Sequence, residues 1–259
     1  MPFAEVSGAR LYWKMEGLAG APPLVLLNSI GTDMDLWDRM LPALRDHFTL
    51  LRLDTRGHGA STAAPGDWSM TLLADDVQAL CDAVGLERFA VAGVSLGGMI
   101  GMTLALRQPE RVEKLALICT SATMDKAAWS ARVEKVRAEG MASIADLAMG
   151  RFLSDGSATD DPSLYQTVRR NLLTMDAQGY AGCAAAIRDM NLADQIGSIT
   201  CPTLVVTGSR DSSTPLEGHG DHLLARIPGA LHQPLEAAHL APLEAPDTLS
   251  RALISFFQG

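Results

Sequence analysis

An uncharged stretch from Phe89 to Leu106 limits what this 259-residue chain can fold into more than any other feature. By length alone the stretch reaches the lower limit for a membrane-spanning helix. However, Gly93, Gly97 and Gly98 interrupt it, and a tight turn there divides it into an apolar strand and an apolar helix. We therefore predict a buried strand that leads directly into a buried helix, in a soluble protein.

Short apolar runs rich in Val, Leu and Ile alternate with helical patterns along most of the chain. This alternation is typical of a parallel sheet, and continuous apolar runs suit strands that helices cover on both faces. We therefore expect an α/β fold with a mostly parallel eight-stranded sheet flanked by helices. The expected strands are Phe3–Val6, Arg10–Met15, Leu24–Leu27, Leu50–Leu53, Phe89–Val94, Leu115–Ile118, Leu204–Thr207 and Leu231–Leu235. The expected sheet-covering helices are Thr71–Val84, Leu96–Arg107 and Ala245–Phe257.

The alternation stops between about Ala122 and Ser198, where helical periodicity continues without a convincing strand. A helical block between two strands of one sheet is expected to lie over the carboxyl edge of that sheet as a lid. We therefore divide the chain into an α/β core, residues 1–121 and 198–259, and an inserted helical lid, residues 122–197. The chain length fits one such domain better than two independent ones.

The turn inside the uncharged stretch carries the pattern G-x-S-x-G, with Ser95 at its centre. A strand before this pattern and a helix after it form the context in which a serine projects from a strained turn above a sheet. Gly93 and Gly97 leave room where the turn is tight, and the helix N-terminus adds partial positive charge beside the serine. We therefore predict that Ser95 is a nucleophile rather than part of a chance glycine-rich turn.

A serine hydroxyl needs a general base, and around such a turn the residues follow in the order serine, acid, histidine. His239 lies just after the expected last strand, at the same sheet edge as Ser95. His232 lies inside that strand, where packing is the simpler role. His219 and His222 stand three residues apart without a third metal ligand nearby, and we interpret them as a solvated helix face. We predict that His239 is the base and that the chain has no metal site.

The acid that orients this base is expected at the end of another strand. Asp211 follows Leu204–Thr207 through a short turn, again at the carboxyl end of a parallel strand. Asp194 and Asp221 also stand between the serine and the histidine, but neither directly follows a strand. Asp211 has a simpler alternative role as the cap of a helix expected near Pro215. On topology we predict that Asp211 is the acid.

An acyl-transfer site also needs two N–H donors for the developing oxyanion. One is expected from Leu96, the residue after the nucleophile, and the second from the loop after Leu24–Leu27, where Ile30 has the right position and Asn28 and Ser29 shape the turn. This second assignment depends on the rest of the site, since the segment could otherwise be a plain strand-to-helix loop.

The loop that follows the expected strand Leu50–Leu53 contains Asp54, Arg56 and His58 among glycines and small polar residues. Such a composition is typical of a structured turn. We therefore interpret these three side chains mainly as scaffold rather than as catalytic groups.

The net charge of −9 and the absence of a leader-like start limit the partners and the location of the protein. A surface of like charge repels phosphates, so neither nucleic acid nor an anionic membrane is an expected partner. Nothing at the start resembles a signal peptide, and the four cysteines form no pairing pattern. We expect reduced thiols, a cytoplasmic location and a small-molecule substrate, with no expectation about the oligomeric state.

Together these motifs resemble the α/β-hydrolase superfamily over the whole chain and, more narrowly, the 3-oxoadipate enol-lactonases of aromatic catabolism. The resemblance depends on Asn28–Asp33 with Trp37, Asp54–Gly59, Gly93–Gly98, Trp129, Arg132, Glu139–Met141, Gly179–Ala181, Cys183, Pro202–Leu204, Gly208–Pro215 and Ala238–His239. Val94 and Leu96 depart from the Leu and Met that relatives often carry around the serine. The resemblance implies hydrolysis of a small anionic enol-lactone to 3-oxoadipate through an acyl-enzyme, without a metal or an organic cofactor. Alternatives are a broad carboxylesterase, a C–C bond hydrolase with the same triad, and a slow-turnover small-molecule receptor.

An anionic substrate of so acidic a protein needs a local cation. Arg132 is the candidate, because its guanidinium could pair with a carboxylate while the nearby indole of Trp129 packs on the lactone ring. The alternative is equally open: Arg132 could be a solvated helix residue and Trp129 an anchor between lid and core.

Overall fold

The computed structural model describes residues 3–259, which contain one sheet of nine strands in the order β1-β2-β4-β3-β6-β7-β8-β9, with β5 paired to β2. The neighbouring strands in the order β4-β3-β6-β7-β8-β9 run parallel. Strand β2 is antiparallel to β1, β4 and β5. All eight expected strands are present, and the ninth has only two residues. The strands are β1 Phe3–Val6, β2 Ala9–Gly17, β3 Pro23–Leu27, β4 Thr49–Leu53, β5 Thr62–Ala63, β6 Phe89–Val94, β7 Val112–Ile118, β8 Thr203–Gly208 and β9 Leu231–Leu235.

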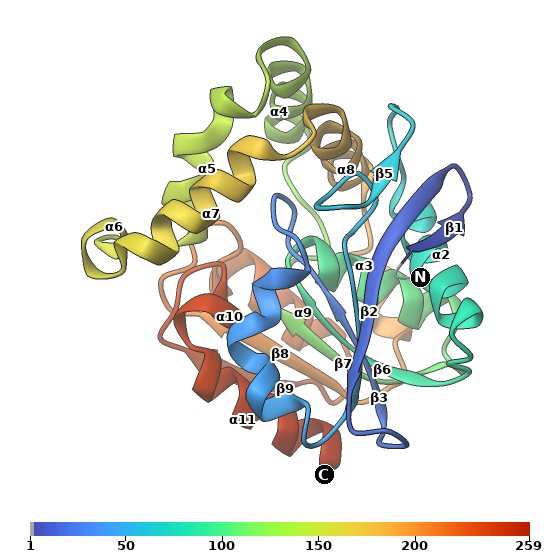
Figure 1. Ribbon diagram of the computed structural model, residues 1–259. Helices are drawn as coiled ribbons and strands as arrows, with labels where there is room; N and C mark the ends of the chain where they lie inside the picture. Colours follow the sequence, from blue (N-terminus) through green and yellow to red (C-terminus); the bar gives the residue numbers. More distant parts are fainter. Residues whose placement is uncertain (1–2) are drawn as a thin grey trace.

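Helices cover both faces of this sheet (Figure 1). On one face lie α2 (Met70–Ala83), α3 (Leu96–Arg107) and α9 (Asp221–Arg226). On the other lie η1 (Met34–Met40), α1 (Leu41–Leu44), α10 (Ala241–Glu244) and α11 (Pro246–Gln258). The three expected covering helices are confirmed, with ends shifted by at most a residue. The helix expected near Pro215 begins instead as a kinked turn, η4 (Leu216–Gly220), before α9.

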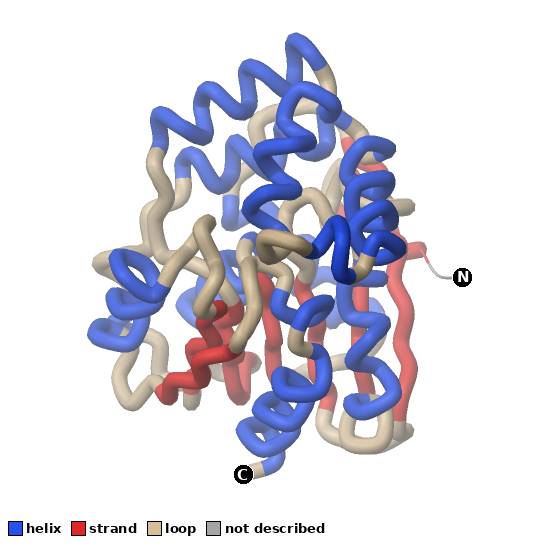
Figure 2. The backbone as a smooth tube through the Cα atoms, turned by 90° about the vertical axis from the view of Figure 1, so that its left-hand side faces the viewer, coloured by secondary structure: helices blue, strands red, loops and turns tan. Residues whose placement is uncertain are grey.

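The chain between β7 and β8, which we call the helical insertion, stands above the carboxyl ends of the parallel strands (Figures 1 and 2). It contains α4 (Lys126–Glu139), η2 (Met141–Ile144), α5 (Ala145–Phe152), α6 (Ser157–Asp160), α7 (Pro162–Thr174), α8 (Ala177–Asp189) and η3 (Ile196–Ser198). Asp125, Asp161 and Asp176 cap three of these helices by accepting backbone N–H groups, which fixes where each begins. The division of the chain at residues 122 and 197 stays a prediction.

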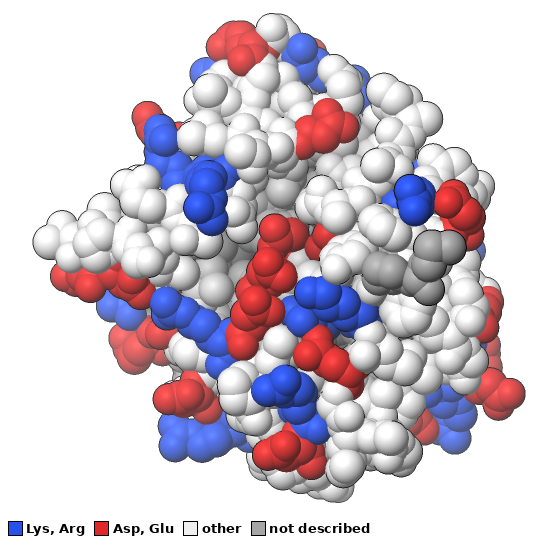
Figure 3. Space-filling model, in the orientation of Figure 1, with Lys and Arg blue, Asp and Glu red and all other residues white. Residues whose placement is uncertain are grey.

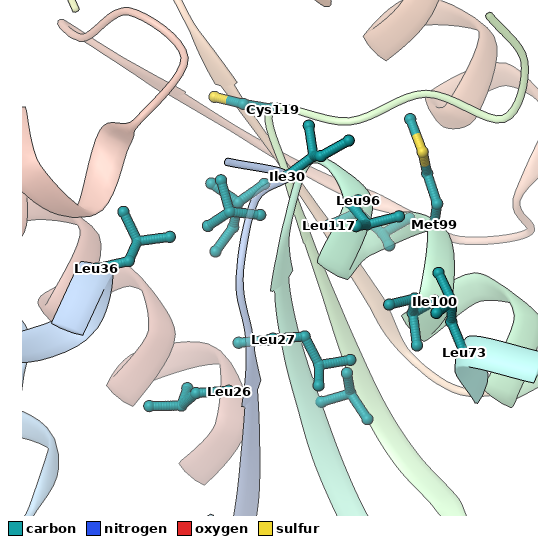
Figure 4. Packing of buried hydrophobic residues seen from close by; sticks show 14 of the residues in the cluster. Leu26, Leu27, Ile30, Leu36, Leu73, Leu96, Met99, Ile100, Leu117 and Cys119 are labelled. Carbon is teal, nitrogen blue, oxygen red and sulfur yellow. The ribbon is translucent and has the colours of Figure 1, made fainter. Parts of the chain in front are cut away.

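The core lies on both sides of the central strands, as their continuous apolar runs predict. Every residue of β6 is buried, and so is nearly all of α3. Figure 4 shows Leu27 of β3 on the side of the sheet where Ile100 of α3 lies, and Leu26 on the other side, toward Leu36 of η1. Rigid packing of this kind fixes the edge of the sheet from which the site is built.

The four cysteines are buried and unpaired. No helix within residues 3–259 is long and apolar enough to cross a bilayer.

Candidate active site

Ser95 occupies a strained turn between β6 and α3. Its φ of 54° and ψ of −113° are rare for a residue with a side chain, and such strain persists only where the surroundings enforce it. The Ser95 N–H donates to the carbonyl of Ile118 at 2.9 Å, and the Ser95 carbonyl accepts the hydroxyl of Thr120 at 2.6 Å. The turn is therefore held from β7 as well as from its own flanking elements.

The two glycines around the serine are required by close packing of the backbone. A Cβ on Gly93 would collide with the backbone of Gly97, and a Cβ on Gly97 would collide with the carbonyl of Leu27 in β3. This close approach lets α3 begin directly above the end of the sheet. The G-x-S-x-G pattern therefore has a steric cause in this chain.

His239 and Asp211 form a buried pair at the same edge of the sheet. The Nδ1 atom of His239 lies 3.0 Å from each carboxylate oxygen of Asp211. Asp211 also accepts the N–H of Ser213 at 2.8 Å and the hydroxyl of Thr214 at 2.8 Å. Burial raises the pKa of Asp211, but the imidazole and these donors outweigh it and hold the pKa at about 2. The carboxylate is therefore ionised, and it both caps its turn and fixes the imidazole.

Ser95, His239 and the expected anion-binding residues line one small pocket. Because Nδ1 of His239 faces Asp211, Nε2 is the ring nitrogen left for Ser95. Figure 3 shows that the surface is hollowed between the helical insertion and the rest of the chain, with acidic side chains along one rim. The lining residues are Ile30, Ser95, Met99, Met124, Trp129, Arg132, Ala148, Arg151, Phe152, Ser213, Thr214 and His239.

The loop after β3 holds Ile30 at the pocket through its neighbours. Asn28 donates from Nδ2 to the carbonyl of Leu53 at 2.7 Å and accepts the indole N–H of Trp37 at 3.0 Å. The N–H of Gly31 donates to Nε2 of His58 at 3.2 Å. On the other side, Leu96 opens α3, where helix geometry leaves the first N–H groups without intrahelical partners.

The Asp54–Gly59 loop is built into the core. Asp54 accepts the N–H groups of Met34 and Ala60, both at 2.8 Å, and Arg56 forms a buried ion pair with Asp76 at 2.6 Å. These contacts agree with the scaffold role predicted for this loop.

Arg132 and Trp129 lie together on α4, facing the pocket. The guanidinium carbon of Arg132 is 4.5 Å from the centre of the Trp129 ring, and Nη1 donates to the hydroxyl of Tyr180 at 3.4 Å. The side chain of Arg132 is half-buried and Trp129 is buried. The indole of Trp129 both packs into the core and lines the site, and the half-buried Arg132 shares that lining.

The prediction that His219 and His222 form a solvated helix face is wrong. Both residues are half-buried, and Nδ1 of His219 lies 2.8 Å from the hydroxyl of Ser121. The chain bends sharply at Gly218, just before His219, and this bend turns the helical segment that follows. Within residues 3–259 no cluster of three His, Cys, Asp or Glu side chains could hold a metal ion.

A family model for the alpha/beta hydrolase fold matches residues 22–246. The chain belongs to this family. The hydrolase is 32% identical to 3-oxoadipate enol-lactonase 2 of Acinetobacter baylyi, over 92% of this chain and 89% of that protein. Among solved structures, an enol-lactonase from Burkholderia xenovorans has a TM-score of 0.97 at 33% identity, covering 100% of both chains. A hydrolase from Pseudomonas aeruginosa has a TM-score of 0.95 at 38% identity, covering 99% of this chain and 98% of that one. The resemblance inferred from the motifs is confirmed.

Five pocket residues of this α/β hydrolase were not singled out from the sequence: Met99, Met124, Ala148, Arg151 and Phe152. Met99 could have been found, because it stands one helical turn after Ser95 on the same face of α3. Arg151 carried no signal. A single arginine in a segment of helical periodicity is indistinguishable from an ordinary solvated surface residue.

Proposed function

We propose that this α/β hydrolase opens a small anionic enol-lactone, 3-oxoadipate enol-lactone or a close analogue, in the breakdown of aromatic compounds. Ser95 is the nucleophile, His239 the general base and Asp211 the acid that orients it. The observation that carries the proposal is that the Asp211–His239 pair and the strained Ser95 turn face one small pocket with cationic side chains. The enol-lactonases among its relatives support the lactone as the substrate class.

The reaction starts when Nε2 of His239 takes the proton of Ser95 and the serine oxygen attacks the lactone carbonyl carbon. The backbone N–H groups of Leu96 and Ile30 stabilise the oxyanion. Collapse of this intermediate breaks the ring C–O bond and leaves an acyl-enzyme with a free enol, which takes the proton from His239. Because an enolate is stabilised by resonance, this departure needs less acid assistance than that of an alkoxide.

Water then completes the turnover. His239 takes a proton from the water, the hydroxide attacks the acyl carbon, and the proton is returned to Ser95 as the acid product leaves. Asp211 stays ionised throughout, because its pKa of about 2 lies far below neutral pH. Its role is to hold the imidazole in the tautomer with hydrogen on Nδ1 and to stabilise the imidazolium.

For substrate binding we propose that Arg132 pairs with the substrate carboxylate and that Trp129 packs on the lactone ring. A broad carboxylesterase is the second candidate, because much of the pocket wall is apolar and could also take a neutral ester; Met99, Met124, Trp129, Ala148 and Phe152 form that wall.

The test compares kcat/KM for 3-oxoadipate enol-lactone with values for neutral aryl esters of similar size. We expect the lactone to be the better substrate by more than about tenfold, and the Ser95→Ala variant to keep less than about a thousandth of the activity. Ser130→Ala is the matched control, since Ser130 bonds only to the backbone of its own helix, at Lys126. Equal or better turnover of neutral esters would favour the carboxylesterase. A single turnover followed by a stall would indicate a receptor.

A further inference from the structure

Two guanidinium groups from different helices face the Ser95 pocket. Arg132 comes from the middle of α4, and Arg151 from the end of α5. Both line the same small space as Ser95 and His239, and both are half-buried. The pocket therefore contains two cations in a chain whose net charge is −9.

Neither of these two arginines is within ion-pair distance of an acidic side chain in the part of the chain that the structure describes. Other arginines of the helical insertion do have such partners. Arg137 and Arg188 both bind Asp67, at 2.6 and 2.9 Å. Because both guanidinium groups are partly withdrawn from water and neither has an acidic partner, the pocket is suited to the negative group of a ligand.

The two guanidinium groups also act on each other. Burial lowers the pKa of Arg151, and the positive charge of Arg132 lowers it further. Two like charges that repel each other are both attracted by a negative group placed between them. A carboxylate has two oxygens, so each guanidinium could donate to it.

Arg151 is held in register with the catalytic histidine. The carbonyl of the next residue, Phe152, accepts the N–H of Leu240 at 3.0 Å, and the Phe152 ring lies nearly parallel to that of His239, with centroids 6.4 Å apart. Two residues further on, Ser154 donates from its N–H and its hydroxyl to Glu244, at 2.7 and 2.8 Å.

The same Glu244 carboxylate accepts the N–H of Ala238, the residue before His239, at 2.6 Å. The end of α5 and the histidine loop therefore share one anchor, which we call the Glu244 clamp. The backbone that carries Arg151 is fixed in this way relative to the reacting groups, so the Arg151 side chain always starts from the same place at the pocket.

We propose that Arg151 is a specificity-determining residue that, together with Arg132, binds the carboxylate at the far end of the acyl substrate from its scissile bond. This inference rests on the proposed function to the extent that Ser95 is the nucleophile, but it does not require a lactone. Hydrolysis of such a substrate leaves a dicarboxylic acid, with the new carboxylate at Ser95 and the old one at the two arginines. A short dicarboxylate such as adipate is therefore expected to bind in this pocket.

The test uses two aryl esters of equal acyl length, one with a terminal carboxylate and the other with a terminal methyl group. Arg151→Met removes the charge while keeping an unbranched side chain of similar length. We expect kcat/KM for the charged ester to fall by about 30-fold or more, the range for losing one partner of a buried charge pair, while the neutral ester changes by less than about threefold. Arg170→Met is the matched control, because Arg170 is an exposed arginine of the same insertion and its loss changes the net charge equally.

Binding gives a second readout that does not depend on turnover. Calorimetry with adipate in a Ser95→Ala background is expected to show weaker binding after Arg151→Met, no change after Arg170→Met, and partial recovery with Arg151→Lys. Equal losses on both esters, or unchanged adipate binding, would overturn the inference. If instead the wild-type protein prefers the charged aryl ester but leaves the enol-lactone intact, the lactone assignment fails and the role of Arg151 stands.

Discussion

The imidazole of His58 accepts a hydrogen bond from the backbone N–H of Gly31, with 3.2 Å between the two nitrogens. The other ring nitrogen, Nδ1, lies 3.1 Å from the carbonyl of Arg56, so this nitrogen carries the hydrogen. Burial lowers the pKa of His58 to about 4, which keeps the ring neutral and able to accept. A buried histidine of the Asp54–Gly59 loop thus fixes the peptide directly after Ile30, the proposed oxyanion donor.

This relationship predicts a defect in kcat when His58 is replaced by leucine. The N–H of Gly31 would lose its acceptor, and the loop would hold the Ile30 N–H less accurately. Because loss of a whole oxyanion donor costs about 10²–10³ in kcat, misplacement of one should cost about 10–100-fold, with KM little changed. Charged and neutral esters should suffer equally, and a glutamine at position 58 should restore part of the rate.

The matched control for this variant is His232→Leu, because His232 is an exposed histidine of β9 that bonds to Thr207 and not to the loop. A fall in kcat/KM that appears only in KM would mean that His58 does not act through the oxyanion donors.

His58 also predicts how stability depends on pH. Its pKa is about 4 in the folded protein and about 6.5 when unfolded, so the unfolded chain takes up a proton first as the pH falls. The folded state should therefore lose about 3 kcal/mol between pH 6.5 and pH 4 from this group. Denaturant unfolding at several pH values should show this loss as a change in the difference between the wild type and His58→Leu.

The ionisation of Asp54 changes the free energy of unfolding in the opposite direction over nearly the same pH range. Burial raises its pKa to about 6, above the ordinary value of 3.8, so its contribution is favourable at low pH and declines as the pH rises between these values. The quantity to compare is therefore the difference in the free energy of unfolding between the wild type and His58→Leu at each pH, because the Asp54 contribution cancels in that difference. Parallel curves for the two proteins would contradict a buried neutral His58.

Asp211→Asn tests the proposed acid. The asparagine amide has nearly the volume of the carboxylate, and its oxygen can still accept the N–H of Ser213. Its NH2 group can also donate to Nδ1 of His239, which favours the wrong tautomer, with the hydrogen on Nε2. The rate on the best substrate should fall by up to about 10⁴, while the thermal midpoint changes by only a few degrees. Asp194→Asn serves as the control. If the rate survives in Asp211→Asn and falls in the control, the acid has been assigned to the wrong residue.

The sequence predicted the site best where a site residue directly follows a strand. Ser95, Asp211 and His239 could be expected at one place because each follows an expected strand, and parallel strands end at one edge of the sheet. Arg151 and Glu244 could not be found in this way. Their positions depend on how the helical insertion docks on the sheet, and helical periodicity gives the apolar face of a helix but not its partner.

The kinked turn at Gly218 escaped prediction for a related reason. Its residues fit a helix locally, but Gly218 adopts a φ of +81° and the half-buried His219 bonds to Ser121 near the end of β7. Such a contact between distant segments overrides local propensity. The role of His58 was hidden in the same way, because its partner Gly31 lies in another loop.

The Glu244 clamp gives the last prediction, tested with Glu244→Gln. The carboxylate accepts three donors, from Ser154 and Ala238, whereas a glutamine amide must turn an N–H toward at least one of them. Leaving a buried donor unmatched should lower the free energy of unfolding by about 1–3 kcal/mol. Since the clamp joins the His239 loop to the end of α5, kcat should fall by about tenfold on charged and neutral esters alike, unlike in Arg151→Met. Proteolysis of the exposed chain around α6 should become faster. The control is Glu110→Gln, because Glu110 is an exposed glutamate in a turn. If Glu244→Gln behaved like this control, the clamp would not hold the two segments together.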